Sequence, residues 1–490
     1  MRSMRHTWNR AIFSAAGLWL LVGALGQQQA RAQGLPDAPL ATLTLSSYAG
    51  SLTAAPATEQ PIPLSLHNAV ERGLEHNLAA VLARQNERIA SGVQMQGLNA
   101  LLPNITASAT RRRNQIDLEA LGFRPGLLAQ FPPGFLPAGV TFGPVVTVNV
   151  VAAQANLQQS LFNWSAIEAF RAEKEQSVAT YYSRQSALGQ VIQNIADTYL
   201  QALADAANVD NAQALLTADA LLVRQTQDAV QAGTATHLDL LRAQVQQQQQ
   251  QQSLIAAQNA LAKTKIALNR QIGLAAEQPI TLTDATPYAD LDTMSIEQAR
   301  KIAYASRQDY QSAQAQARAS EHASAAARWE RMPTLNFNGN YGVTGTVGGV
   351  YHGTFLAAGE LSVPIFREAS LRGDRDATAA ERQQAQERLA SLRASIDAEL
   401  RDSLLDVAAS KQLTDVAHSN VDLARQSLSD STERFLNGVE DNLAVVEAQA
   451  ELAAAQAQWV NSLNAYNQAK LGLARNLGIL EQQYRAYLGL

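Results

Sequence analysis

The chain has 490 residues, no cysteine, 6% aromatic residues and a formal charge of −5. The lack of cysteine excludes a disulfide framework, a CxxC redox site, a thiolate zinc site and a lipid anchor on an N-terminal cysteine. The net negative charge argues against nucleic acid as a partner, because phosphate binding needs a basic surface.

Residues 1–32 have the features of a cleaved export signal. Three arginines near the start are followed by an apolar run at 11–26 and by an A-x-A sequence at 30–32. The apolar run is shorter than the roughly 20 residues that a bilayer span needs. Removing 1–32 takes away four arginines and no acid, which leaves a formal charge of −9. Residues 33–62 are rich in Ala, Pro, Thr and Ser, and we expect them to form a flexible lead-in.

The rest of the chain contains two similar halves. Four pairs of segments match in the same order: 64–69 with 294–299, Pro103 with Pro333, 157–162 with 361–366, and 232–244 with 437–449. We therefore expect a first repeat at 63–277, a second at 278–482 and a tail at 483–490. The spacing falls from 230 to 204 between the second and third pairs, so the first repeat has 26 extra residues, expected in a surface loop.

Each repeat is expected to begin with a helix, at 64–100 and at 294–330, that ends before a proline. Two strands should follow, because apolar and polar residues then alternate, which is typical of half-buried strands. The apolar positions of the four strands are Ile105, Ala107 and Ala109; Val146, Val148 and Val150; Leu335, Phe337 and Tyr341; and Phe355, Ala357 and Leu361.

A long helical hairpin should complete each repeat. Residues 165–231 contain no proline and would form a helix about 100 Å long, a length that indicates coiled-coil packing. Apolar residues seven apart support this interpretation in both repeats: Leu216, Val223 and Val230, and Val421, Leu428 and Phe435. Gly233 and Gly438 are expected to make the turns, since glycine readily adopts the backbone angles of a helix end. The return helices should begin near Leu238 and Leu443.

Four strands are too few to close a membrane barrel, because the smallest barrels have about eight. Open strand edges in lipid leave backbone groups unpaired, so the sequence requires partners. Three copies would give twelve strands and a tube of twelve helices, and closed cyclic symmetry makes a homotrimer a natural solution. The expected fold is therefore mainly α with a membrane β-barrel part: long antiparallel coiled coils plus four strands per protomer, internally duplicated. No stretch of eighteen apolar residues beyond the signal predicts a membrane-spanning helix.

The duplicated order, the prolines at helix–strand junctions and the step at Val363-Pro364-Ile365-Phe366 resemble the TolC-type outer-membrane efflux family. The resemblance covers roughly residues 62–482. It implies a trimeric channel-tunnel in the outer membrane of a Gram-negative-type cell, with a helical barrel in the periplasm and a closable inner end. It also implies two partners, an inner-membrane pump and a periplasmic adaptor.

The resemblance implies roles for residues at the hairpin ends. The turns Gly233-Thr234 and Gly438-Val439 correspond to the periplasmic tips where the adaptor docks, although each could be an ordinary hairpin turn. Asp239 and Glu447 lie where the family places acids of its periplasmic gate. Two departures stand out: Phe435 replaces a tyrosine and Glu440 replaces an arginine, so the family's linking bonds cannot be copied. Our hypothesis for a gate bond is an ion pair between Arg242 and Glu440; the other interpretation is solvated charges on a helix face.

Two further tracts have open interpretations. Gln246 to Gln252 is a run of seven glutamines, which are good helix formers, and we expect a polar helix surface. Arg111, Arg112 and Arg113 follow the first expected strand. They could contact lipid phosphates at the outer rim or form a charged loop base.

No catalytic or metal-binding pattern is present in the sequence. It contains no HExxH, no close pair of histidines, no GxSxG and no P-loop, so no enzyme, metal or cofactor is expected. The expected function is an exit duct for small molecules in a tripartite efflux or type I secretion system. A periplasmic coiled-coil adaptor or scaffold is the alternative, but it would leave the duplicated strand pairs unexplained. The cargo cannot be named from the sequence.

Overall fold

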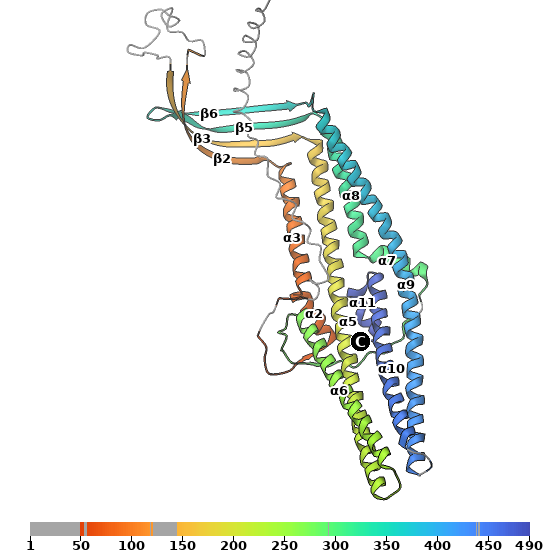
Figure 1. The fold of residues 1–490 in the computed structure, drawn as a ribbon. Helices are drawn as coiled ribbons and strands as arrows, with labels where there is room; N and C mark the ends of the chain where they lie inside the picture. The colour runs from red at the N-terminus through yellow and green to blue at the C-terminus, as the bar shows by residue number, and fades with distance from the viewer. Residues whose placement is uncertain are drawn as a thin grey trace, which may run out of the picture. The chain divides into compact units, whose positions relative to one another are not determined.

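The computed structural model describes residues 50–52, 56–117, 119–120, 145–292, 294–437, 439 and 442–490. These residues belong to one unit of the chain, Leu45–Leu490. The expected export signal, most of the lead-in and most of the expected loop of the first repeat lie outside the described residues. Figure 1 shows four strands at one end of the unit, from which long helices run away in hairpins.

The elements come in the same order twice. The first set is α2 (Leu66–His76), α3 (Leu78–Asn99), β2 (Asn104–Asp117), β3 (Val145–Phe162), α5 (Trp164–Gln231) and α6 (His237–Gln271). The second set is α7 (Ile296–Ser306), α8 (Gln308–Trp329), β5 (Thr334–Thr346), β6 (Tyr351–Ser362), α9 (Glu368–Leu436) and α10 (Asn442–Asn476). The predictions of four strands, of a long helix over 165–231 and of return helices near Leu238 and Leu443 are confirmed.

The first helix of each half differs from its prediction, because each is two helices. Asn77 separates α2 from α3, and Arg307 separates α7 from α8, each in extended backbone. Asn77 begins α3 by accepting a 3.0 Å hydrogen bond from the Ala79 amide at its Oδ1 atom. Arg307 makes no such cap. Its guanidinium instead binds Asp309, two residues on, and Glu399, 92 positions away, so this break is held partly by a long-range ion pair.

Three short elements were not predicted. Strands β1 (Ile62–Leu64) and β4 (Ile280–Leu282) pair in parallel, which joins the starts of the two halves. Helix α11 (Leu480–Leu488) spans the expected boundary between the second repeat and the tail at 483–490. Its Leu480 and Leu488 are buried, so apolar burial holds this segment against the molecule.

The four long strands form one antiparallel sheet with the order β2-β3-β5-β6. Strands β3 and β5 pair along their length and so connect the two halves. Within the described residues, β2 and β6 each pair on one side only. Both edges of the sheet therefore carry backbone groups without a strand partner.

The register divides the side chains of this sheet between an apolar and a polar face, because strand partners point to the same side. Apolar residues of all four strands share one face: Ile105, Ala107, Ala109, Ala153, Ala155, Leu157, Leu335, Phe337, Tyr341, Val343, Phe355, Ala357 and Leu361. Hydrogen bonds cross the other face, for example from Asn156 to Ser108 (3.1 Å) and from Gln154 to Thr344 (3.3 Å). The apolar positions predicted for the first, third and fourth strands thus share one face, whereas the predicted positions of the second strand, Val146, Val148 and Val150, lie on the other.

This division ends at one row of partners, Arg111, Val151, Gly345 and Tyr351. Beyond the row, β2 and β3 continue as a two-stranded ribbon. There Val146, Val148 and Val150 share the face of Gln154. The opposite face now carries Arg113, Gln115, Thr147 and Asn149, so the apolar band stops at this row.

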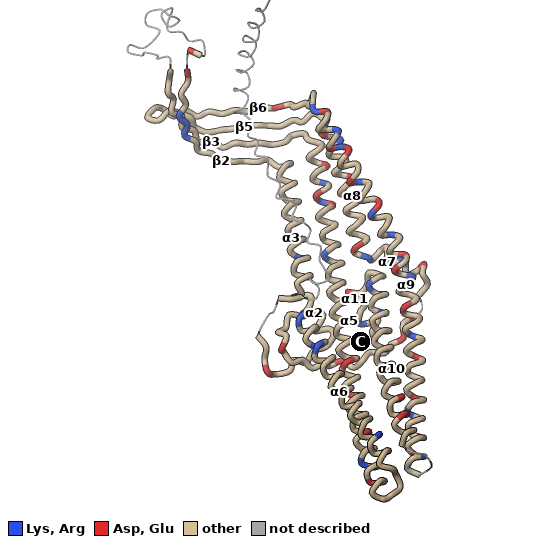
Figure 2. The backbone as a smooth tube through the Cα atoms, in the orientation of Figure 1, with Lys and Arg blue, Asp and Glu red and all other residues tan. Residues whose placement is uncertain are grey.

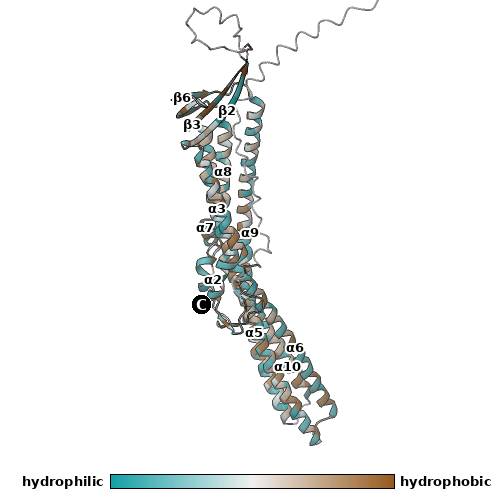
Figure 3. Ribbon diagram, turned by 90° about the vertical axis from the view of Figure 1, so that its left-hand side faces the viewer, coloured by the Kyte–Doolittle hydropathy of each residue, from teal (hydrophilic) through white to brown (hydrophobic). Residues whose placement is uncertain are grey.

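Helix α5 packs against α3, α6, α8 and α10, whereas α9 packs against α8 and α10. Hydrophobic and hydrophilic residues alternate along both hairpins (Figure 3). Three of the heptad residues, Val223, Leu428 and Phe435, pack against one buried cluster near the hairpin ends, as coiled-coil packing predicts. None of the helices in the described part of the chain is long and apolar enough to cross a membrane.

Candidate functional site

The hairpin ends farthest from the sheet carry the residues that the sequence singled out. At the first end, Gly233 follows α5 with a φ of +76°. The Thr234 amide donates to Ala229 O (2.9 Å) and the Gly233 amide donates to Val230 O (3.1 Å). These two bonds close a Schellman motif, in which glycine adopts the left-handed conformation at no steric cost. The predicted turn at Gly233 is confirmed.

The second hairpin ends α9 with a similar bond, since the Val439 amide donates to Arg434 O at 2.9 Å. Val439 is exposed, whereas Gly438 and Glu440 lie outside the described residues. Of the four tip residues expected to dock a partner, the structure therefore places Gly233, Thr234 and Val439.

Asp239 stabilises the start of the first return helix. The Thr236 amide and hydroxyl both donate to Asp239 Oδ2, at 2.9 and 2.7 Å, and the Asp239 amide donates to Thr236 Oγ1 at 3.2 Å. This reciprocal arrangement is a capping box. The hydrogen bond from the Thr236 hydroxyl holds the pKa of Asp239 below its usual value, and the charge of Arg242 contributes in the same direction. Asp239 is therefore ionised at neutral pH.

A hydrogen bond joins the starts of the two return helices. Asn442, the first residue of α10, donates from Nδ2 to the main-chain oxygen of Asp239 at 2.7 Å. Asn442 is fully buried, and its Oδ1 accepts no hydrogen bond among the described residues. This contact was not predicted from the sequence, and it is a direct polar link between the two hairpin ends.

An apolar cluster above this link packs the two hairpins together. Leu222 of α5, Ala243 of α6 and Val445 of α10 are its buried members. Helices α5 and α10 run antiparallel along this seam, because a hydrogen bond from Asn464 to Gln201 joins them farther from the hairpin ends. Residues one helical turn before Leu222 on α5 therefore lie at the same height as residues one helical turn after Val445 on α10.

At that level the seam contains buried polar groups without partners among the described residues. Asp219 is only 2% exposed, and neither of its carboxylate oxygens accepts a hydrogen bond. Gln449 Oε1, one turn after Val445, is likewise buried and without a donor. Burial raises the pKa of Asp219 to about 6. Burying a carboxylate without hydrogen bonds costs free energy, so Asp219 lowers the stability of the seam between the hairpins.

The proposed gate residues are only partly brought together. Arg242 Nη1 lies 3.5 Å from Asp239 Oδ1 on the same helix, a contact that the sequence did not predict. The ion pair expected between Arg242 and Glu440 lies outside the described residues. Glu447 is exposed on α10. In the described ranges, no group of three or more acidic or histidine side chains is placed to hold a metal ion.

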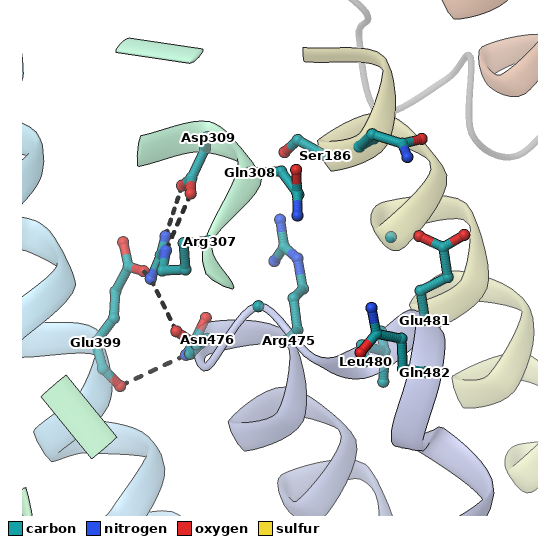
Figure 4. A pocket seen from close by; sticks show the side chains of 13 residues that line it. Ser186, Arg307, Gln308, Asp309, Glu399, Arg475, Asn476, Leu480, Glu481 and Gln482 are labelled. Carbon is teal, nitrogen blue, oxygen red and sulfur yellow. Dashed lines mark hydrogen bonds and ion pairs between the residues drawn. The ribbon is translucent and has the colours of Figure 1, made fainter. Parts of the chain in front are cut away.

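A second polar site lies midway along the helices, at the break between α7 and α8 (Figure 4). It is a pocket of about 440 Å³, lined by residues of α5, α8, α9, α10 and α11. The guanidinium of Arg307, 8% exposed, binds Asp309 at 2.7 Å and Glu399 at 2.6 Å. Burial alone would raise the pKa of Asp309, but the hydrogen bonds and charge of Arg307 outweigh it and hold this pKa below its usual value. Because Arg307 pairs with an acid of α8 and an acid of α9, this site joins the two helices.

Comparisons with known proteins agree with this architecture. A family model described as outer membrane efflux protein matches residues 71–274 and 299–479, which is more than half of the chain. No curated protein sequence matches the chain.

Solved outer-membrane channels share the fold. The outer membrane protein VceC from Vibrio cholerae is 18% identical, with a TM-score of 0.68 over 84% of this chain and 96% of that one. The CmeC channel of Campylobacter jejuni is 17% identical, with a TM-score of 0.67 over 89% and 92%. A membrane protein from Pseudomonas aeruginosa is also 17% identical, with a TM-score of 0.72 over 84% and 93%.

Proposed function

The chain belongs to the outer membrane efflux protein family, and from this premise we propose that it is the exit duct of a tripartite efflux or type I secretion system. It would act as a passive channel for small molecules that an inner-membrane pump and a periplasmic adaptor deliver. The family consists of channels, not enzymes.

The observation that carries the proposal is the exposed apolar face of the sheet. Phe355, Tyr341 and Leu361 on this face are 80%, 73% and 68% exposed. On β5 the apolar positions run from Leu335 to Val343, about 27 Å along a strand. Tilted by 35–45°, such a strand covers about 20 Å of bilayer, close to the apolar band of membrane barrels. The polar face, with its asparagines, glutamines and threonines, would line the water-filled lumen.

Charge and aromatic side chains support this placement. Strands β3 and β5 contain no charged residue, and β6 contains one acid. Figure 2 shows basic residues gathered along β2 at its bend, where the four-stranded sheet ends. At the other end of the sheet, the Trp164 and Trp329 rings pack edge to face at 5.9 Å. Tryptophan is enriched at the membrane–water boundary.

A homotrimer would satisfy the two open sheet edges. Strand β6 of one copy would pair with β2 of the next, and three copies would close a barrel of twelve strands. Exposed apolar residues on the helices support a similar contact below the sheet. They include Leu238, Leu241, Val245 and Ile255 on α6, and Leu405, Leu413, Val416 and Leu423 on α9. Packing α6 of one copy against α9 of the next would bury both stripes in a tube of twelve helices.

An internal duplication would explain why the elements occur twice in one order. The breaks at Asn77 and Arg307 support it, since they lie 230 residues apart, which is the spacing of the first matching segments. We retain the expected repeats, 63–277 and 278–482, with α11 as a closing helix of the second.

The hairpin ends would form the periplasmic end of the duct. We propose that the adaptor docks at the turns Gly233-Thr234 and Gly438-Val439. We propose a gate of Asp239, Arg242, Glu440 and Glu447 around this end. Asn442 joins this set because its hydrogen bond to Asp239 connects the hairpins within one chain.

The test of the proposed function is the oligomeric state in membranes. The mature protein should be recovered from outer-membrane fractions only with detergent. On a gel it should migrate as a trimer before heating and as a monomer after heating. Recovery as a soluble periplasmic monomer would instead favour the adaptor or scaffold alternative.

A further inference from the structure

The three consecutive arginines of β2 lie on different faces of the sheet. Arg111 pairs with Val151 and Arg113 with Asn149, both in the register of the apolar face. Arg112 pairs with Val150, which lies on the face of Gln154. Because side chains alternate along a strand, two of the arginines project from the face that would meet lipid, and one from the face that would line the lumen.

Arg111 and Arg113 lie where the apolar band ends. Along β2, Ile105, Ala107 and Ala109 precede them on the same face. Arg111 belongs to the last row of the four-stranded sheet, which ends in Tyr351 on β6. Tyrosine and arginine side chains at this depth suit a membrane interface, where an apolar stem lies beside lipid tails and a polar end meets headgroups.

The two guanidinium groups are available for a ligand. All three arginines are exposed, and among the described residues no acidic side chain forms an ion pair with any of them. A guanidinium presents a planar set of donors that matches a phosphate, and alternate strand positions place the two groups roughly 7 Å apart. A pair of cations outside an apolar band is therefore complementary to anionic headgroups.

We propose that Arg111 and Arg113 bind phosphate groups of outer-leaflet lipids, whereas Arg112 faces the lumen and takes no part. The inference rests on the proposed function, since it requires the apolar face to lie in a membrane. In a trimer it gives three equivalent sites, each on β2 where the four-stranded sheet ends.

Native mass spectrometry of the detergent-solubilised protein tests this inference, with added bisphosphorylated lipid A as the probe. The wild type should retain lipid A, and an Arg111→Gln/Arg113→Gln variant should retain it at least fivefold less. Arg112→Gln removes one neighbouring positive charge from the opposite face and is the control; it should retain as much lipid A as the wild type. Heat-modifiable migration of each variant shows that it has assembled.

Equal retention by the double variant, or an equal loss in Arg112→Gln, would overturn the inference. If the double variant does not assemble, the inference is tested instead by how lipid A retention by the wild type depends on salt. Retention should fall steeply between 0.1 and 0.5 M NaCl, because salt screens exposed charges, and retention unaffected by salt contradicts the inference. Failure of the proposed function gives a different result, namely a wild-type protein that is soluble without detergent and binds neither lipid A nor phosphatidylcholine.

Discussion

Asn442 donates a 2.7 Å hydrogen bond from its side-chain amide to the main-chain oxygen of Asp239, and so ties the first turn of α10 to the first turn of α6. The two residues are 203 positions apart in sequence. The Asp239 carboxylate accepts hydrogen bonds from Thr236 and lies beside Arg242. The main-chain oxygen of Asp239 is therefore the atom that contacts the other hairpin. A gate that opens by separating the hairpins would have to break this bond.

Asn442→Leu should loosen the hairpin ends. The variant removes a buried hydrogen bond, which is worth about 1 kcal/mol. Hydrogen–deuterium exchange should accelerate in residues 236–246 and 442–450. Asn437→Ala is the control, because the Asn437 side-chain amide donates to Glu433 O of its own helix and not to the other hairpin among the described residues. Equal protection of Asn442→Leu and the wild type would contradict the role assigned to this bond.

Asp219→Asn should stabilise the protein at high pH. Burial raises the pKa of Asp219 from about 4 to about 6, so the unfolded chain loses this proton at lower pH than the native protein does. The contribution of Asp219 to stability is therefore lost as the pH rises from about 4 to about 6, and it stays lost above that. Asparagine carries no charge at any of these pH values.

Guanidinium unfolding at pH 8 and pH 4.5 checks this prediction. At pH 8 the variant should gain about 2 kcal/mol, and at pH 4.5, where the native carboxyl is still protonated but the unfolded one is largely ionised, the gain should fall to less than half of that. Asp210→Asn, which changes an exposed acid of the same helix, should have little effect at either pH. A gain of equal size at both pH values would show that charge burial is not the cause.

Gly233→Ala and Gly189→Ala should change stability in opposite directions. A Cβ atom at either position meets no atom within 4 Å, so neither variant is limited by space. At Gly233 the φ of +76° strains alanine by about 1 kcal/mol. Gly189 lies within α5, where alanine is favoured by up to about 1 kcal/mol. Urea unfolding measures both, and destabilisation by Gly189→Ala would mean that another part of the assembly occupies that space.

Arg307→Lys should destabilise the joint between α8 and α9. Lysine keeps the buried charge but cannot contact Asp309 and Glu399 with one planar group, so one of these half-exposed acids loses its partner. We expect a loss of about 2 kcal/mol in thermal unfolding experiments. Arg372→Lys is the control, since its pair with Glu368 is exposed and should matter little. Similar melting temperatures for the two variants would contradict the structural role of Arg307.

The parts of the fold that could be predicted are those with a local pattern. Alternating residues located the four strands, heptads located the long hairpins, and Gly233 located a turn. The break at Asn77 could have been suspected from the sequence, because asparagine often precedes the first residue of a helix. The break at Arg307 could not, since it depends partly on an ion pair to Glu399, 92 positions away. Strands β1 and β4 escaped prediction for a similar reason: each has three residues, and they pair across 218 positions.

The candidate site was predictable to a smaller extent. Asp239 and Arg242 stand out because charged residues are few near the start of α6. Asn442 does not, because its partner is a backbone carbonyl that any residue could supply. The lowered stability of the seam could not be foreseen either, since the burial of Asp219 and Gln449 depends on how α5 and α10 pack.

Single-channel recording in a planar lipid bilayer tests the central claim most directly. Purified, detergent-extracted protein should insert as a trimer and give discrete conductance steps of uniform size, with one step for each inserted assembly. A detergent-extracted trimer that never conducts ions, with or without Asn442→Leu to loosen its inner end, would contradict the account of this chain as an exit duct.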